Sequence, residues 1–228
     1  MKYSLVTPFL DAQLTEIRSK IRLSMNGIVS GLMAQNGIVY KINYGVSIPR
    51  IKEIALSYIP NHELAQRLWL PDIRETMILA TLLEPTDQFT PEMAREWVSR
   101  FNQIEIVEQA CMNLFSKLPF AGELCLEWVH SDKIWIQVTG FILATRIFGT
   151  LNHTEMIRII KRGLDLSSTT ELHLYKAIGL CLSRFCRKDK QMATYILKEI
   201  EAISQTSSIS ELYISTEVKQ EILILNTL

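Results

Sequence analysis

The sequence predicts an all-α fold, and three observations lead to this prediction. Apolar residues recur at helical spacing in almost every segment between turn-forming residues, and no segment alternates convincingly as a strand. The periodic segments are roughly 8 to 20 residues long and are joined by short turns, as antiparallel helix pairs require. The composition, 48% hydrophobic and 21% charged, is that of an ordinary folded protein.

The first predicted helix spans residues 8–35. Thr7 and Pro8 have the residue types of an N-cap and a first helical turn, and the Asn-Gly pair after residue 35 supplies an end. Gly27 and Gly31 within this helix have a small-x-x-x-small spacing. We therefore expect another helix to approach closely there.

The next helices are separated by prolines and short polar turns. A turn at residues 44–47 comes before a helix that opens with Pro49 and is ended by Pro60, and Pro71 and Pro85 bracket another. The remaining boundaries follow from the same signals and from Thr90–Pro91. Apart from the first and the central helix, the predicted helices cover residues 48–59, 61–69, 72–83, 92–101, 104–118, 121–129, 153–164, 170–186, 190–203 and 211–225.

The central predicted helix is residues 131–148. Its apolar residues occupy more than one helical face, so water can cover little of it. Ser131 has the residue type of an N-cap, Asp132 places a negative charge in the first turn, and Gly149 supplies a stop.

Helix pairs recur at a spacing of about 40 residues, which is typical of HEAT-type arrays. Such an array buries the apolar faces of each pair against its neighbours and curves into an α-α superhelix, a solenoid with a concave groove. We expect a single domain over residues 1–228. A compact orthogonal helical bundle is the architectural alternative.

Composition also bounds the class of protein. No run of about 18 apolar residues is present, and the N-terminus lacks the apolar core of a signal peptide, so we expect a cytoplasmic protein without a membrane span. The four cysteines lie in apolar helical patterns without a C-x-x-C pair, which favours reduced, buried thiols. They are Cys111, Cys125, Cys181 and Cys186.

The formal net charge is zero, yet the charges are unevenly spread. Residues 1–52 carry a balance of +5, residues 53–132 carry −8, residues 146–198 carry +6, and residues 199–228 carry −4. The basic block from Arg146 to Lys198 is the best candidate for a surface that binds a polyanion. The alternative is that these side chains are solvated outer faces of helices.

Five segments carry a resemblance to a known family. They are residues 44–55, residues 63–69, residues 74–80, residues 131–135, and residues 175–179 with Leu182 and Arg184 beyond them. Their sequences, order and spacing resemble the bacterial DNA alkylation repair family, which contains HEAT-repeat alkylpurine DNA glycosylases. The resemblance covers about residues 10 to 190 and implies an α-helical solenoid that holds DNA.

The resemblance also implies where the catalytic groups of the family would lie. The family's W-D-x-x-D motif falls on residues 104–108, where Glu108 keeps the last carboxylate and Ile104 replaces the tryptophan. The expected arginine falls on Val138, three residues after Trp135, and the second cleft tryptophan falls on Leu180. A carboxylate and aromatic faces stabilise a sugar cation, so these aliphatic replacements argue against conventional excision of alkylated purines.

Three functional hypotheses follow. The first is duplex DNA binding through a basic concave surface, with salt-sensitive phosphate contacts. The second is a protein-interaction solenoid that no longer binds DNA. The neutral net charge and the acidic residues 53–132 favour this hypothesis. The third is an active glycosylase with a rearranged site on Glu108. The residues expected to contact DNA are Arg158, Lys161, Arg162, Lys176, Arg184, Arg187 and Lys188.

The remaining candidate residues are read as structural. Apolar neighbours favour packing for Trp69, Trp97 and Trp128, and also for Trp135, although the resemblance places Trp135 in the groove. Glu108 is also interpreted as a carboxylate satisfied by an arginine such as Arg100. The four histidines are far apart and no nucleotide or nucleophile motif is present, so we expect no metal site and no cofactor.

Overall fold

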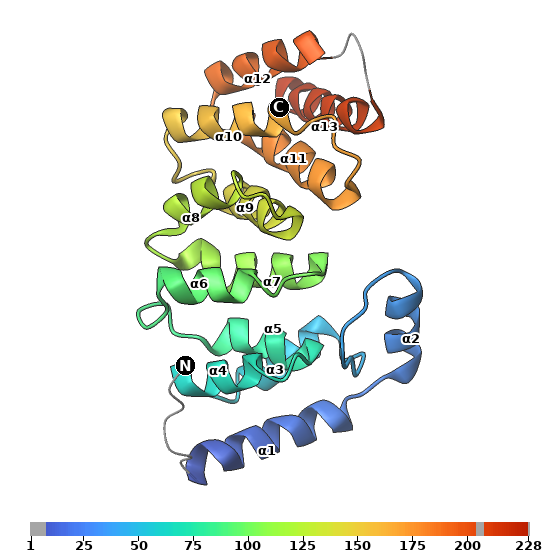
Figure 1. The fold of residues 1–228 in the computed structure, drawn as a ribbon, viewed down its shortest axis with the longest axis vertical. Helices are drawn as coiled ribbons and strands as arrows, with labels where there is room; N and C mark the ends of the chain where they lie inside the picture. The colour runs from blue at the N-terminus through green and yellow to red at the C-terminus, as the bar shows by residue number, and fades with distance from the viewer. Residues whose placement is uncertain (1–7, 204–207, 228) are drawn as a thin grey trace. The chain divides into compact units, whose positions relative to one another are not determined.

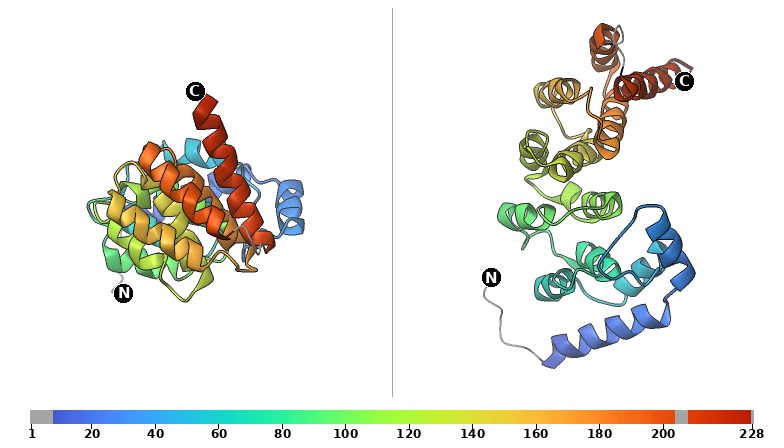
Figure 2. Two further views of the ribbon diagram at one scale, coloured as in Figure 1. Left: turned by 90° about the horizontal axis from the view of Figure 1, so that it is seen from above. Right: turned by 45° about the vertical axis from the view of Figure 1, so that its right-hand side comes forward.

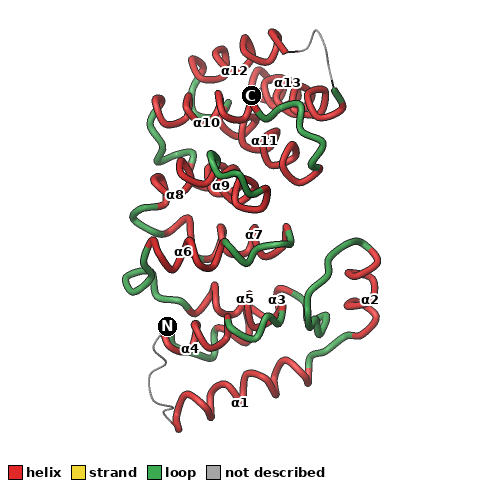
Figure 3. Tube along the Cα trace, in the orientation of Figure 1, coloured by secondary structure: helices red, strands yellow, loops and turns green. Residues whose placement is uncertain are grey.

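The computed structural model describes residues 8–203 and 208–227 of the chain. These residues form thirteen α-helices and one short 3-10 helix, as Figures 1 and 3 show. Within them, strand pairing is confined to one isolated bridge between Ile42 and Ile73. The prediction of an all-α fold is confirmed. The helices divide between two compact units, Met1–Thr90 and Pro91–Leu228.

The first unit contains five helices. They are α1 (Pro8–Leu23), α2 (Gly27–Gln35), α3 (Ile48–Ala55), α4 (His62–Trp69) and α5 (Arg74–Leu83). Helix α5 packs against α3 and α4, and α1 lies against α3 and α4. Helix α5 is buried along almost its whole length, so it forms the centre of this unit.

The second unit is a stack of helix pairs in two layers (Figures 1 and 2). One layer contains α6 (Pro91–Val98), α8 (Ala121–Trp128), α10 (His153–Asp165) and α12 (Lys190–Ile203). The other contains α7 (Ile104–Asn113), α9 (Ile134–Ile147), α11 (Leu172–Phe185) and α13 (Ile209–Thr227), and the short helix η1 (Phe115–Lys117) follows α7. Helix α9 contacts α7, α8 and α11, which is why its apolar residues occupy several faces.

Most predicted helix boundaries agree with the structure. Asn61 and Asn152 are N-caps whose side chains accept hydrogen bonds from the first turns of α4 and α10. Ser47 caps α3 in the same way, and its backbone lies just after the turn that Gly45 makes with a φ of 69°. Polar capping residues and prolines therefore mark where these helices begin.

Two predictions about helix ends are wrong. The helix expected over residues 8–35 is broken after Leu23, because Asn26 turns the chain and caps α2 by accepting a hydrogen bond from the Val29 amide. Thr7, its expected N-cap, lies outside the described residues. Ser131 does not cap α9; the N-cap is Lys133, whose amide donates to the Ser131 hydroxyl.

The close approach predicted at Gly27 and Gly31 is also absent: a Cβ atom added at either position would meet nothing within 4 Å. The close approach occurs in the central helix instead. A Cβ at Gly140 of α9 would lie 2.7 Å from the Val129 amide nitrogen, where α9 crosses the end of α8. The close helix contact expected at a glycine therefore occurs at Gly140 and not at Gly27 or Gly31.

Burial agrees with the expected core. Trp69, Trp97 and Trp128 are almost fully enclosed, as predicted. All four cysteines are free and buried, and burial raises the pKa of each thiol, to about 12 for Cys125 and Cys186. None of the helices in the described part of the chain has the length and hydropathy of a membrane span.

Candidate nucleic-acid interface

Glu108 lies in two adjoining hollows on the layer of α7, α9, α11 and α13. The first hollow, about 360 Å³, is lined by Glu108, Ile142, Thr145, Arg146, Phe148, Leu180 and Arg184. The second, about 190 Å³, is lined by Ile104, Glu108, Ile142, His173, Lys176, Ala177, Leu180, Tyr213 and Glu217. Glu108 on α7, Ile142 on α9 and Leu180 on α11 line both hollows.

Helical spacing explains why these side chains share one surface. Ile104 and Glu108 are four residues apart on α7, and Ile142 and Arg146 are four apart on α9. On α11, Lys176, Leu180 and Arg184 repeat at the same interval. Residues spaced by four lie on one face of a helix, so each helix presents a short stripe to the hollows.

The first hollow contains two arginines and one carboxylate, whereas the second contains Lys176 with the carboxylates of Glu108 and Glu217. Arg146, Lys176 and Glu108 are exposed, and Arg184 is partly exposed. In the described part of the chain, no ion pair within 4.0 Å involves Glu108, Arg146, Lys176 or Arg184. The interpretation of Glu108 as a carboxylate paired with Arg100 is therefore wrong. The cations remain available to an external anion.

The seven basic residues expected to bind DNA do not share one surface. Lys176 and Arg184 on α11 line the hollows. Arg158 and Lys161 are exposed on α10, in the other layer, and line neither hollow. The sequence contains equally basic stripes on α10 and α11, and only the packing of the pair decides which one borders the hollows.

The other three predicted DNA-binding residues have partners within the protein. Arg162 donates from Nε to the Val129 carbonyl oxygen at 3.1 Å. Arg187 forms a two-bond ion pair with Glu221. Lys188 donates from Nζ to the Gly149 carbonyl oxygen at 2.9 Å. These contacts tie neighbouring segments together, so these residues are less suited to phosphate binding than Lys176 and Arg184.

The four positions assigned to the groove do not all line the hollows. Leu180 lines both hollows, and Ile104 lines the second. Val138, a residue of α9, lines neither, because its side chain is fully buried. Trp135 is partly exposed rather than part of the core, and its ring lies 5.1 Å from the His173 ring.

Sequence reasoning missed several residues that line the hollows. The sequence marks Arg146 only as the start of the basic block. Arg146 lines the first hollow because it lies four residues after Ile142 on the central helix. Tyr213 and Glu217 come from α13, far along the chain, and the sequence holds no signal that joins them to Glu108. No group of three or more metal-ligating side chains occurs among the described residues.

Comparison with known proteins gives two findings. A family model described as DNA alkylation repair enzyme matches residues 33–210. A solved structure described as "A new family of proteins related to the HEAT-like repeat DNA glycosylases with affinity for branched DNA structures" is similar in fold, with a TM-score of 0.79 at 13% sequence identity. The match covers 91% of this chain and 93% of the other, and it supports the HEAT-like architecture. Comparison with curated protein sequences found no significant match.

Proposed function

Because this chain belongs to the DNA alkylation repair family, we propose that it binds DNA through the hollows of the second unit. In this proposal Arg146, Lys176 and Arg184 contact phosphates, and the apolar side chain of Leu180 lies against the sugar-phosphate backbone. Duplex DNA is the first ligand to test. The branched-DNA affinity stated for the structural neighbour makes branched DNA the second form to test.

The observation that carries this proposal is the convergence of cations without partners. Three cationic side chains from α9 and α11 border the hollows, and none of them forms an ion pair with the described residues. Arg95 and Lys20, by contrast, have carboxylate partners in Glu127 and Glu16. A surface that leaves three of them unpaired is suited to a polyanion.

The same geometry disfavours excision of an alkylated purine. That reaction builds positive charge on the sugar and starts from a cationic base, so a site must present negative charge and aromatic faces to it. Here the Glu108 carboxylate shares its hollow with Arg146 and Arg184, and residues 104 and 180 are aliphatic. Two arginines beside one carboxylate favour a bound anion over a developing cation.

The test is a pair of charge reversals measured by fluorescence anisotropy with labelled DNA. We expect Lys176→Glu with Arg184→Glu to weaken duplex binding by about tenfold or more at about 50 mM salt, and to reduce the slope of log K against log salt by about two. The matched control is Arg158→Glu with Lys161→Glu, which makes the same change of charge on α10, outside the hollows. It should change neither quantity appreciably.

Two results would contradict the proposal. Equal losses in the two double variants would mean that only net charge matters, and wild-type protein that binds no DNA at low salt would remove the function altogether. A base-release assay on methylated duplex provides the check on chemistry. We expect no release above the rate without protein, whereas release that Glu108→Gln abolishes would establish a rearranged glycosylase.

A further inference from the structure

Helix α2 in the first unit turns its apolar residues outward. Its sequence, GIVSGLMAQ, is the kind that normally packs into a core, yet none of its residues is buried. Ile28 is 79% exposed and Leu32, one turn later on the same face, is 53% exposed; Val29 beside them and Met25, just before the N-cap, are also exposed. An apolar face of this kind on a folded protein is commonly an interaction surface.

Polar contacts on the opposite face hold α2 in place. The Asn26 amide donates to the Tyr44 carbonyl oxygen at 2.8 Å, and the Ser30 hydroxyl donates to the Asn43 carbonyl oxygen at 2.9 Å. The Asn43 amide also donates to the Met33 sulfur at 3.5 Å. The fold therefore attaches α2 through its polar face and leaves its apolar face unused.

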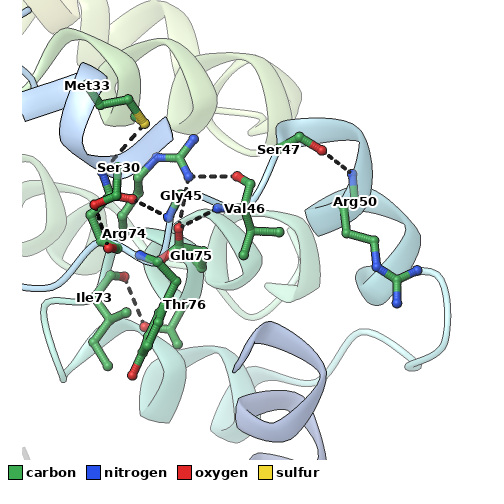
Figure 4. A network of polar contacts seen from close by, with 12 residues as sticks. Ser30, Met33, Gly45, Val46, Ser47, Arg50, Ile73, Arg74, Glu75 and Thr76 are labelled. Atoms are coloured by element: carbon green, nitrogen blue, oxygen red, sulfur yellow. Dashed lines mark hydrogen bonds and ion pairs between the residues drawn. The ribbon is translucent and has the colours of Figure 1, made fainter. Parts of the chain in front are cut away.

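The loop that receives α2 is itself anchored by a buried ion pair (Figure 4). Glu75 accepts hydrogen bonds from the Tyr44 and Val46 amides at 3.1 and 3.2 Å. Arg74 donates to Glu75 at 2.9 Å and to the Val46 carbonyl oxygen at 2.8 Å. Because both side chains are buried in α5, the position of α2 is fixed by the core of the unit.

The surroundings of α2 are cationic. Residues 17–52 contain six basic residues and no aspartate or glutamate. Arg18 and Arg22 line a hollow of about 230 Å³ with Ile21, Ile42, Tyr44, Ile73 and Thr76. Neither arginine forms an ion pair with the described residues. Tyr44, which lines this hollow, also accepts a hydrogen bond from the backbone amide of Asn26, the N-cap of α2.

An apolar helix face, together with unpaired arginines on the helix that precedes it, fits a particular feature of nucleic acids. At a branch point, base pairs lose stacking on one side, and apolar side chains can take the place of the missing neighbour. Phosphates crowd together at the same point and attract arginine. We propose that the apolar face of α2, with Arg18 and Arg22, binds the branch point of branched DNA. This inference rests on the proposed DNA binding and adds the element that distinguishes a junction from a duplex.

The experiment compares a three-way junction with a linear duplex of equal length. The wild-type protein should bind the junction more tightly. Ile28→Ser with Leu32→Ser should weaken junction binding about tenfold and leave duplex binding unchanged, because apolar contacts with the exposed bases are lost and phosphate contacts are kept. Arg18→Glu with Arg22→Glu should weaken junction binding and reduce its salt dependence.

A matched control is available in the same unit. Leu56 and Ile59 are 86% and 85% exposed beyond the end of α3, and Leu56→Ser with Ile59→Ser should change binding to neither DNA. A second readout comes from 2-aminopurine placed at the branch. Its fluorescence should change when the wild-type protein binds and should not change with the Ile28→Ser, Leu32→Ser protein.

Other results would overturn the inference. One is a junction affinity of the Ile28→Ser, Leu32→Ser protein within about twofold of wild type, and another is an equal loss for junction and duplex. Binding of the wild-type protein to acidic phospholipid vesicles would reassign the face to a membrane if the same substitutions abolished vesicle binding alone. A wild-type dimer in sedimentation would reassign the face to a second copy of the chain if the substitutions abolished dimerisation alone. A wild-type protein that binds neither DNA would instead refute the proposed function itself.

Discussion

Glu108 is the single acidic side chain shared by the two hollows, and its environment makes a sharp prediction. Arg146 and Arg184 border the same space, so a phosphate bound to them lies near the carboxylate and is repelled by it. Glu108→Gln should therefore strengthen duplex binding by about two- to fivefold, the scale of an exposed charge interaction. Anisotropy titrations at low salt measure the effect. Weaker binding by the variant would show that the carboxylate has a positive role in holding DNA.

Glu84 provides a residue-scale prediction about stability. Its side chain is fully buried and accepts hydrogen bonds from Gln66 and His62. Burial raises the pKa of the Glu84 carboxyl above its ordinary value of 4.5, although those hydrogen bonds act in the opposite direction. A raised folded-state pKa means that the stability contributed by the protonated carboxyl is fully present below pH 4.5 and is lost as the pH rises through the folded value.

Glu84→Gln removes this titration while keeping an acceptor for Gln66. The free energy of unfolding of the variant should therefore improve relative to wild type as the pH rises above 4.5, the ordinary pKa of the carboxyl. Urea unfolding at several pH values measures the difference, and Glu123→Gln, at an exposed site on α8, controls for the change of residue type. A constant difference across this range would mean that the carboxyl does not titrate differently in the folded state.

At the scale of the element, two glycines make opposite predictions. A Cβ at Gly140 would lie 2.7 Å from the Val129 amide nitrogen, so Gly140→Ala should push α9 away from α8 and cost about 1 to 3 kcal/mol. A Cβ at Gly31 would meet nothing within 4 Å, so Gly31→Ala should stabilise α2 by about 0.5 to 1 kcal/mol. Urea denaturation of the two variants tests the pair. Similar effects for both would mean that the α8–α9 contact can relax.

Helix positions were largely predictable because their signals are local. Asn61, Pro91 and Asn152 mark helix starts whatever the tertiary structure is. The break after Leu23 was missed although Asn26 and Gly27 carry a turn signal, because the apolar pattern continues across it. The need for a glycine at position 140 was missed because the backbone that a side chain there would meet, at the end of α8, belongs to another helix.

The site was only partly predictable for the same reason. Glu108, Ile104 and Leu180, which the resemblance assigns to one site, line the same hollow, since spacing along a helix is preserved on its surface. Val138 was assigned to the groove although the burial predicted for the central helix already argued against it, and it is buried. The choice between the basic stripes of α10 and α11 depends on pair packing, which one helix's sequence does not contain.

At the scale of the whole molecule, a neutral chain presents cations in two separate places. The first unit has Arg18 and Arg22 beside α2, and the second has Arg146, Lys176 and Arg184 around Glu108. The negative charge that balances them is concentrated in residues 53–132 and 199–228. Net charge alone therefore gives no measure of the affinity of this protein for a polyanion, because local fields decide where an anion binds.

The cysteines allow a final prediction about how the two units unfold. All four are buried in the second unit, and burial raises the pKa of their thiols, so they should be protonated and unreactive toward a disulfide reagent at neutral pH. Helical circular dichroism, in contrast, reports both units. We propose that residues 1–228 act as one cooperative domain, so the urea midpoint for thiol exposure should coincide with the midpoint for loss of helix. Thiols that react at a different urea concentration would show that the units unfold separately.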